Sequence, residues 1–215
     1  MQQILVYGDS LSWGIIPGTR RRFSFAQRWP GVLEGRLIQK GHDVRVIENC
    51  LNGRRTVFSD PYKEGRDGSE GLAQVMEINA PLSLVIVVLG TNDFQMMHSN
   101  NAWSSAQGIV KLLDIIKSAP IEPGMPVPPI LLVAPPPMSE PKGPVKDKFL
   151  GAKEKSSGLS DALRQVAEDR GLAFFDMGQV TASSRVDGIH LDEDQHATVG
   201  NALVECVERL IVEQH

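Results

Sequence analysis

Residues 82–93, LSLVIVVLGTND, decide the fold class of this chain. Seven of the eight residues from 82 to 89 are aliphatic. A near-continuous aliphatic run of this length is typical of a central strand that helices cover on both faces. Gly90-Thr91-Asn92-Asp93 ends the run. We therefore predict a buried strand that delivers polar side chains to its carboxyl end.

Shorter segments on either side of this strand extend the pattern. Apolar runs predict further strands at residues 4–7, 44–47, 130–134 and 172–175. Helices are predicted at residues 24–39, 70–78, 102–117, 146–170 and 194–212. Strands that alternate with helices form a parallel sheet with helices on both faces. The fold class is therefore α/β, and a site is expected at the carboxyl ends of the strands.

The composition fits one domain that spans residues 1–215. The chain has 215 residues, 41% of them hydrophobic, and no Pro-, Gly- or Ser-rich linker divides it. Its net charge of −4 argues against a nucleic-acid partner, which would require a basic surface. The one basic cluster, Arg20-Arg21-Arg22 with Arg28 nearby, is more typical of a solvated loop than of an anion site.

The N-terminus and the cysteine content indicate the cellular environment. No run of about 18 or more apolar residues occurs, so neither a membrane span nor a membrane partner is expected. Met1-Gln2-Gln3 leads directly into the first predicted strand, so no signal peptide is expected and a cytoplasmic location is predicted. Cys50 and Cys206 have neither disulfide-framework nor metal-ligand spacing, and we interpret them as small buried apolar side chains.

Ser10 follows the first predicted strand, in Gly8-Asp9-Ser10-Leu11-Ser12. A serine in this position is commonly a helix N-cap. It can instead be a nucleophile, provided that a base removes its proton, because a free hydroxyl is a weak nucleophile at neutral pH. Taken alone, Ser10 is compatible with both interpretations.

Asp187-Gly188-Ile189-His190 offers such a base. Imidazole titrates near neutral pH, so His190 can accept the serine proton. Asp187, three residues earlier, can fold back on the ring, keep its other nitrogen protonated and stabilise the imidazolium. Gly188 permits the tight bend that this requires. The alternative interpretation of the segment is a surface turn before a helix.

An acyl-transfer intermediate also needs hydrogen-bond donors aimed at its negative oxygen. Three donors are available: the Asn92 side-chain amide, the Gly53 backbone N–H and the Ser10 backbone N–H. Each motif has an ordinary alternative, because Asn92 can cap a helix and Asn52-Gly53 can form a turn. Their common position, each just past a strand, favours the functional interpretation.

Together the four segments resemble the SGNH/GDSL hydrolase superfamily. The matching residues are Gly8-Asp9-Ser10-Leu11-Ser12, Gly53, Gly90-Thr91-Asn92-Asp93 and Asp187-Gly188-Ile189-His190. The resemblance implies a flavodoxin-like three-layer α/β/α sandwich with a five-stranded parallel sheet. It also implies ester hydrolysis through an acyl-enzyme, without a metal or other cofactor. Ser10, Asp187 and His190 would be catalytic, and Ser10, Gly53 and Asn92 would form the oxyanion hole.

Other segments are similar to the small arylesterase and acyltransferase (perhydrolase) branch of that superfamily. They are Trp13-Gly14, Val46-Ile47-Glu48, Leu51-Asn52-Gly53-Arg54, Asp60-Pro61, Pro135-Pro136-Pro137 and Phe174-Phe175-Asp176. Arg55, an additional basic residue before Thr56, departs from the second segment. The branch implies action on short-chain acetyl and aryl esters, acyl transfer or perhydrolysis as a further activity, and assembly into a homo-oligomer, an octamer or a dimer.

Apolar residues beside the candidate catalytic groups are expected to form the substrate pocket. Trp13, Phe94 and Ile189 are the predicted walls, with ordinary core packing as the alternative. A second apolar set, Met96, Met97 and Phe149, is expected at a pocket entrance or a subunit contact.

Other functions remain open from the sequence. Five potential ligands crowd into ten residues, and they could hold a metal: Asp187, His190, Asp192, Asp194 and His196. No known ligand-spacing motif supports that reading. A nucleotide-binding module would suit the fold class, but residues 8–14 have no phosphate-binding glycine motif. Within the superfamily, a carbohydrate acetylesterase and a thioesterase or lysophospholipase remain alternatives to the arylesterase.

Overall fold

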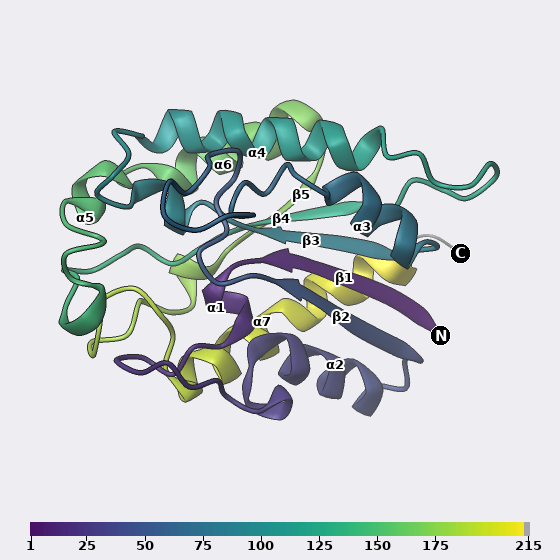
Figure 1. Ribbon diagram of the computed structural model, residues 1–215. Coiled ribbons are helices and arrows are strands. Elements are labelled where there is room, and N and C mark those ends of the chain that lie inside the picture. The colour runs from purple at the N-terminus through teal and green to yellow at the C-terminus, as the bar shows by residue number, and fades with distance from the viewer. Residues whose placement is uncertain (213–215) are drawn as a thin grey trace.

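The computed structural model describes residues 1–212, so the last three residues of the predicted domain lie outside the described residues. Its centre is a five-stranded parallel sheet with the order β2-β1-β3-β4-β5 (Figure 1). The strands are β1 (Gln2–Gly8), β2 (Val44–Cys50), β3 (Leu84–Val88), β4 (Ile130–Ala134) and β5 (Ala173–Asp176). This confirms the predicted sheet, and the strand order is that of the flavodoxin-like folds.

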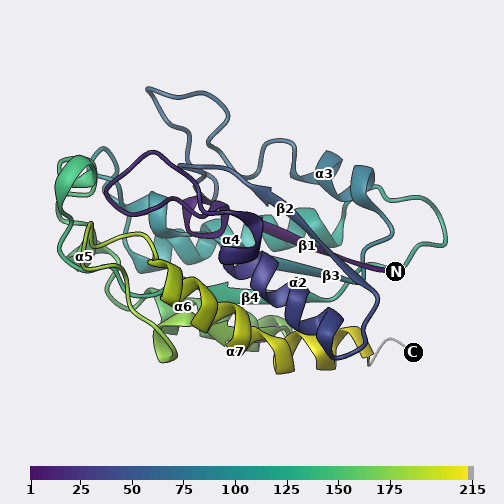
Figure 2. The same cartoon turned by 90° about the horizontal axis from the view of Figure 1, so that it is seen from below.

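Helices cover both faces of the sheet. They are α1 (Ser10–Trp13), α2 (Trp29–Gln39), α3 (Leu72–Asn79), α4 (Ala102–Lys117), α5 (Ala152–Lys155), α6 (Leu159–Arg170) and α7 (Glu193–Val212). In Figure 1, α3, α4 and α6 lie above the sheet, and α2 and α7 lie below it. Figure 2 shows α2 and α7 side by side on the lower face. The predicted three-layer sandwich is confirmed.

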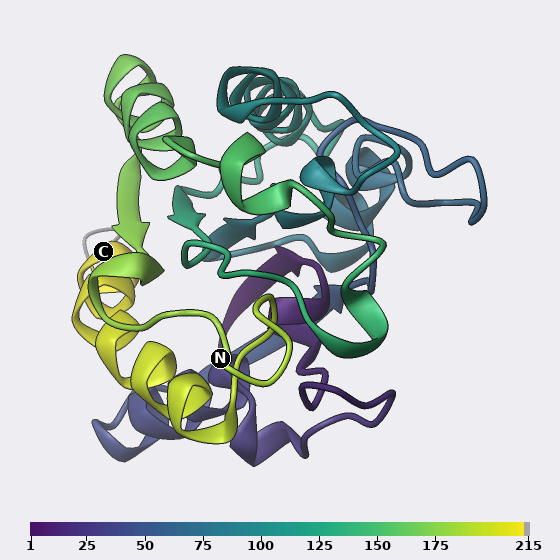
Figure 3. The ribbon, with the colours of Figure 1, turned by 90° about the vertical axis from the view of Figure 1, so that its left-hand side faces the viewer.

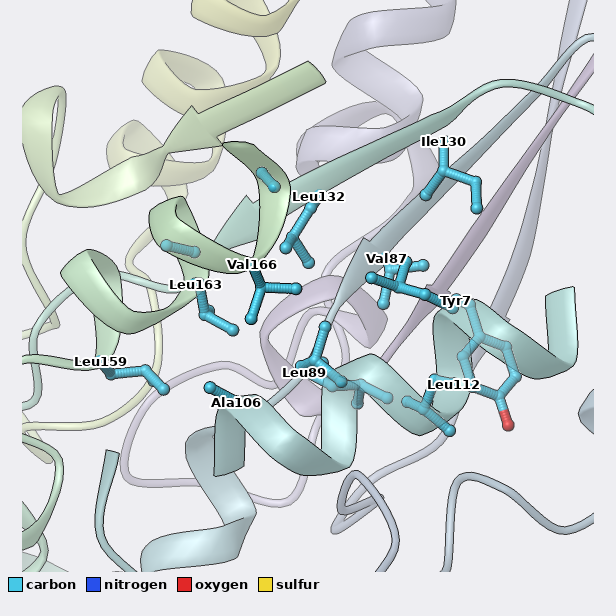
Figure 4. Packing of buried hydrophobic residues seen from close by; sticks show 14 of the residues in the cluster. Tyr7, Val87, Leu89, Ala106, Leu112, Ile130, Leu132, Leu159, Leu163 and Val166 are labelled. Atoms are coloured by element: carbon cyan, nitrogen blue, oxygen red, sulfur yellow. The ribbon is translucent and has the colours of Figure 1, made fainter. Parts of the chain in front are cut away.

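The alternation of side chains along β1 explains why two apolar cores form. Leu5 and Tyr7 belong to the core under α3, α4 and α6, which Figure 4 shows from close by. Ile4 and Val6 belong to the core under α2 and α7. Successive residues of a strand point to opposite faces, so a strand between two helical layers must be apolar throughout. Every residue of β3 meets this requirement and is buried.

Two helix predictions differ from the structure. The predicted helix at 146–170 is divided into α5 and α6. Gly151 and Gly158 precede these two helices with φ of +74° and +81°, a left-handed conformation that interrupts a right-handed helix. The predicted helix at 24–39 begins with a 3₁₀ turn at Phe25–Gln27 and then breaks at Arg28, which is extended.

All five parallel strands have their carboxyl ends on the same side of the sheet, and this side faces the viewer in Figure 3. The segments that follow the strands collect on this side. On the opposite side the start of β1 meets the end of α7, because Gln2 Nε2 donates to the Ile211 carbonyl at 3.0 Å. Within residues 1–212, no helix is both long and apolar enough to cross a membrane.

The contact between α2 and α7 depends on a glycine. A Cβ added at Gly200 would lie 2.6 Å from Val32 Cβ and 2.9 Å from the Trp29 carbonyl oxygen. We expect Gly200→Ala to lower the free energy of unfolding by about 1–3 kcal/mol, because it overpacks this contact. Urea denaturation measures the change.

Gly35→Ala is the matched control on α2. A Cβ at Gly35 meets nothing within 4 Å. Alanine is favoured over glycine inside a helix, so this variant should gain about 0.5–1 kcal/mol. Equal stabilities for the two variants would contradict the close helix contact.

Candidate active site

Ser10 lies at the carboxyl end of β1, as the first residue of the single-turn helix α1. Asp9, not Ser10, caps this helix: its Oδ1 accepts the Leu11 N–H at 2.9 Å. The N-cap interpretation of Ser10 is therefore wrong. Because the cap is made by its neighbour, the Ser10 hydroxyl is left to make other contacts.

One of those contacts is with His190. Its Nε2 lies 3.1 Å from Ser10 Oγ, and its Nδ1 lies 2.7 Å from Asp187 Oδ2. All three side chains are almost fully buried. Residues 177 positions apart in the sequence are thus joined in one hydrogen-bonded chain, in the order that general-base activation of a hydroxyl requires.

The loop after β5 holds Asp187 in place. Its Oδ1 accepts the backbone N–H groups of Ile189 and His190 at 3.0 and 2.9 Å. Burial alone would raise the pKa of Asp187, but the hydrogen bond and charge of His190 and these two N–H groups lower it to about 2. Asp187 is therefore a carboxylate at neutral pH and can accept the His190 Nδ1 proton.

Gly188 makes the bend of this loop possible. Its φ is +79°, and an added Cβ would lie 2.3 Å from the Glu140 carbonyl oxygen. The chain here runs against residues 139–142, with Ser139 N–H donating to the Gly188 carbonyl and Lys142 N–H to the Asp187 carbonyl. A residue with a side chain at position 188 would be strained in this left-handed conformation and would clash with the Glu140 carbonyl.

Asn92 lies in a 3₁₀ helix, Thr91–Phe94, that follows β3. Its Nδ2 donates to Asp9 Oδ2 at 2.9 Å, and its Oδ1 accepts from Gln95 Nε2 at 2.7 Å. These two bonds fix the orientation of the amide. Because Nδ2 carries two hydrogens, the second can donate into the cavity that Asn92 lines.

Asp9 connects the Ser10 and Asn92 segments. Burial raises the pKa of its carboxyl to about 6, although the Leu11 N–H, the charge of His190 and the Asn92 amide all act to lower it. The same carboxyl thus caps α1 with one oxygen and orients Asn92 with the other. One buried carboxyl group therefore fixes two neighbouring parts of the site.

Gln95 is held in turn by buried charges. Its Oε1 accepts from the guanidinium of Arg55, which is fully buried and forms an ion pair with Asp60 at 3.1 Å. The additional arginine of the second sequence segment thus has a role in this structure. It completes a chain of contacts that runs from Asp60 through Gln95 to the Asn92 amide.

Gly53 follows β2 and has φ of +83°. Its backbone N–H has no acceptor in the part of the chain that the structure describes, and the residue lines the same cavity as Ser10 and Asn92. Arg54 next to it donates to the carbonyl groups of Gly8 and Asn49 and lies over the Tyr7 ring at 4.0 Å. Arg54 thereby ties the carboxyl ends of β1 and β2 together.

A cavity of about 270 Å³ contains these groups. Its lining includes two glycines and six residues with uncharged polar or catalytic side chains: Gly18, Gly53, Ser10, Thr19, Asn52, Asn92, Asp187 and His190. Its apolar lining consists of Ile15, Pro144, Val145 and Phe149, and its charged lining of Arg20, Asp60, Lys63 and Lys148. The cavity is small, with an apolar wall and several polar groups that converge on Ser10.

The predicted pocket walls lie elsewhere. Phe94 and Ile189 are 0% and 1% exposed and pack into the core under α4 and α6. Trp13 lies against the Arg22 guanidinium, 4.5 Å from its ring centroid. None of the three lines the cavity. Proximity to Ser10, Asn92 or His190 in the sequence did not translate into a position in the pocket, because neighbouring residues in a turn point in different directions.

Of the second apolar set, Met96, Met97 and Phe149, one residue lines the cavity and two do not. Phe149, expected at an entrance or a subunit contact, lines the cavity. Met96 is 60% exposed and does not line it. Met97 is half-buried and does not line the cavity either; its Sδ accepts from the Arg55 guanidinium at 3.4 Å.

Four residues of the metal alternative are engaged in other contacts, and Asp187 and His190 are bonded to each other. His190 contacts Ser10, Asp192 accepts from Ser184 Oγ at 2.8 Å, and buried His196 accepts the Trp29 N–H at 3.3 Å. Among residues 1–212, no group of three or more His, Cys, Asp or Glu side chains is arranged to hold a metal ion. The sequence cluster at 187–196 therefore does not form a metal-binding group among these residues.

The comparison with known families agrees with this geometry. The profile of the GDSL-like Lipase/Acylhydrolase family matches residues 6–198, which include every residue of the Ser10 site. The chain belongs to this family. The resemblance predicted from the sequence is thereby confirmed.

Solved structures match nearly the whole chain. The inhibitor-bound aryl esterase of M. smegmatis is 33% identical, with a TM-score of 0.92 over 98% of this chain and 100% of that chain. A carbohydrate acetylesterase from Sinorhizobium meliloti is 32% identical, with a TM-score of 0.91 over the same shares. An arylesterase from Vibrio mimicus is 32% identical over 92 residues, which are 43% of this chain and 38% of that protein.

Several groups in the site of this GDSL-family chain were not foreseen. Asp9 and Gln95 orient Asn92, and Arg20, Lys63 and Lys148 line the cavity. Asp9 stands beside Ser10 in the first motif, so its position was the one signal that could have identified it. The three cations come from separate loops, and no sequence pattern connects them.

The low pKa of Asp187 predicts a pH-dependent contribution to stability. Since folding lowers this pKa from its ordinary 3.8 to about 2, the carboxylate stabilises the fold above about pH 4, and the contribution is lost as the pH falls toward 2. Asp187→Asn should therefore lower the free energy of unfolding at pH 7 by on the order of 2 kcal/mol.

Urea denaturation at pH 7, 5 and 3.5 tests this linkage. We expect the deficit of Asp187→Asn to shrink at the lowest pH, because the carboxyl of the unfolded chain, with its ordinary pKa of 3.8, is then largely protonated while the native carboxylate is still ionised. Asp161→Asn, at an exposed position of α6, controls for the loss of one negative charge. A deficit that stays constant over this range would rule out the linkage.

Proposed function

We propose that this protein is a serine esterase that hydrolyses short-chain acyl esters, acetyl and aryl esters among them, through an acyl-enzyme. The observation that carries the proposal is the Ser10–His190–Asp187 chain in the wall of a small cavity, with spacings of 3.1 and 2.7 Å. Membership of the GDSL-like family and the similarity to the aryl esterase of M. smegmatis support it.

Ser10 Oγ attacks the ester carbonyl carbon while His190 Nε2 takes its proton. Asp187 keeps Nδ1 protonated and stabilises the imidazolium that forms. His190 then gives its proton to the oxygen of the leaving alcohol, and the acyl group stays on Ser10. A water molecule next loses a proton to His190 and attacks the acyl-enzyme, which releases the acid and restores the Ser10 hydroxyl.

The negative oxygen of each tetrahedral intermediate needs donors that are already in place. In our proposal these are the backbone N–H groups of Ser10 and Gly53 and the Asn92 Nδ2 hydrogen. Asp9 and Gln95 act as positioning residues, because they hold the Asn92 amide with its nitrogen toward the cavity. No reorientation is then required when the charge develops.

The size of the cavity supports a short acyl group. About 270 Å³ must contain the acyl group and at least part of the alcohol. A long-chain lipase or thioesterase would need an extended apolar groove. We keep carbohydrate acetyl esters as a second substrate class, because the Sinorhizobium meliloti acetylesterase is similar over the whole fold and polar side chains such as Thr19, Asn52 and Asp60 line part of the cavity. Acyl transfer to an alcohol or to peroxide is a further proposed activity of the same acyl-enzyme.

Assembly, organisation and location also remain proposals. Exposed apolar side chains at Met96, Trp103 and Leu150 favour a homo-oligomer, the predicted dimer or octamer. The single-domain organisation remains a prediction over residues 1–215. The cytoplasmic location is supported by two cysteines that form no disulfide among the described residues.

The first test follows hydrolysis of 4-nitrophenyl esters from acetate to laurate. We expect the highest kcat/KM for acetate, and a fall of at least about 10³-fold in kcat for Ser10→Ala, because the nucleophile is removed. Ser12→Ala is the matched control, since it removes a nearby hydroxyl that does not line the cavity.

Two results would count against this proposal. Unchanged activity in Ser10→Ala would remove the nucleophile assignment. A maximum at laurate would keep the serine mechanism but indicate a lipase or thioesterase rather than a short-chain esterase.

The second test addresses the oxyanion donor. Asn92→Ala should lower kcat by about 10²–10³-fold. Gln95→Glu keeps the acceptor for Arg55 but turns a carboxylate oxygen toward Asn92 Oδ1, so we expect kcat to fall by about tenfold with little change in KM.

Gln165→Glu, at an exposed position of α6, makes the same chemical change away from the cavity. Steady-state kinetics on 4-nitrophenyl acetate measures all three variants. If Gln95→Glu raised KM and left kcat unchanged, Gln95 would act on substrate binding rather than on the Asn92 amide.

A further inference from the structure

Three cations from separate parts of the chain converge on the cavity of Ser10. Arg20 lies in the loop after α1, Lys63 in the loop after β2, and Lys148 in the segment between β4 and α5. All three line the same cavity of about 270 Å³. Their convergence is a property of the folded chain, because 128 positions separate the first from the last.

The carboxylates of the cavity do not neutralise these cations. Two acidic residues line it, Asp60 and Asp187. Asp60 forms its ion pair with buried Arg55 at 3.1 Å, and Asp187 is bonded to His190 at 2.7 Å. Within residues 1–212, neither Arg20, Lys63 nor Lys148 has an acidic partner within 4 Å. The cavity therefore carries an excess of positive charge.

This excess stands out against the whole chain, whose net charge is −4. The three cations also act on one another. The pKa of Lys148 lies below its ordinary value, chiefly because the ammonium is partly desolvated; Arg55, Lys63 and Arg20 lower it further, and Asp60 alone opposes them. A negatively charged group bound among the cations would relieve this repulsion and gain their combined attraction.

We propose that the preferred ester substrate carries a negative charge, and that Arg20, Lys63 and Lys148 bind it while Ser10 acts on the ester group. The inference deepens the proposed esterase function and rests on it. All three side chains are exposed to solvent, and exposure alone would not support a binding site. Here the cations line the same cavity as the reactive hydroxyl, and the nearby carboxylates already have partners.

Two acetate esters of similar size test the charge preference, 4-acetoxybenzoate and neutral phenyl acetate. The measured quantity is the ratio of their kcat/KM values, anionic over neutral. We expect the triple variant Arg20→Gln, Lys63→Gln, Lys148→Gln to lower this ratio by about tenfold. Since both enzymes see the same two leaving groups, their different chemical reactivity cancels in the comparison. Raising the salt concentration to about 0.5 M should lower the wild-type ratio in the same direction.

A second triple variant serves as the matched control. Arg21→Gln, Lys117→Gln and Lys146→Gln remove the same net charge at exposed positions that do not line the cavity. We expect its ratio to equal that of the wild type. If both triple variants lowered the ratio equally, the effect would come from net charge and the inference would be overturned. A ratio that neither set of substitutions changed would overturn it as well.

A binding experiment separates this inference from the proposed function. Calorimetry measures the affinity of Ser10→Ala for 4-acetoxybenzoate, with and without the three cavity substitutions. If the wild type hydrolyses neither ester, the proposed function fails. The inference then stands only if Ser10→Ala binds the anion and the substitutions weaken that binding by about tenfold. Absent binding, or equal binding by both proteins, overturns it. Hydrolysis of phenyl acetate without any charge preference overturns the inference and leaves the esterase proposal intact.

Discussion

The parallel pairing of β1 with both of its neighbours is the constraint on which the site depends. Gly8 pairs with Cys50 of β2 on one side and with Val88 of β3 on the other. The residues that follow these three positions must therefore emerge side by side. Ser10, Gly53 and Asn92 are two, three and four residues further along their chains. Three segments remote in sequence thus supply one cavity without any long loop to place them.

Buried polar contacts then give these segments a single geometry. Asp9 joins the β1 and β3 segments through Asn92, and Asp93 joins β2 to β3 by accepting the backbone N–H and hydroxyl of Thr56. Burial raises the pKa of Asp93 to about 6, against the hydrogen bonds of Ser105 and Thr56. A buried carboxylate opposes folding unless both of its oxygens accept hydrogen bonds. Both oxygens of Asp9 and of Asp93 do so. These bonds hold the oxyanion donors in place before charge develops, as electrostatic preorganisation requires.

The sequence predicted the sheet and the contacts around Ser10 because both depend on local patterns. An aliphatic run such as 82–89 has few alternatives to a buried strand, and Asp187-Gly188-Ile189-His190 contains its own bend. Phe94 and Ile189 were assigned to the pocket but do not line the cavity. The sequence could not show this, because the direction of a side chain in a turn depends on the φ and ψ angles of the backbone around it. The division of the predicted helix at 146–170 was also missed, because the left-handed conformation of Gly151 and Gly158 is a property of the folded backbone. The convergence of Arg20, Lys63 and Lys148 could not be predicted, since it depends on how three loops pack together.

The contact between Gln2 and Ile211 places two convenient attachment positions on the side of the sheet that lies away from the cavity. The first strand begins and the last helix ends next to each other, at the edge of the sheet opposite the cavity. A support, a fluorophore or a fusion partner attached near either position would leave the mouth of the cavity facing the solvent. The same adjacency means that a short peptide between residues 2 and 211 would not cross the cavity side of the sheet.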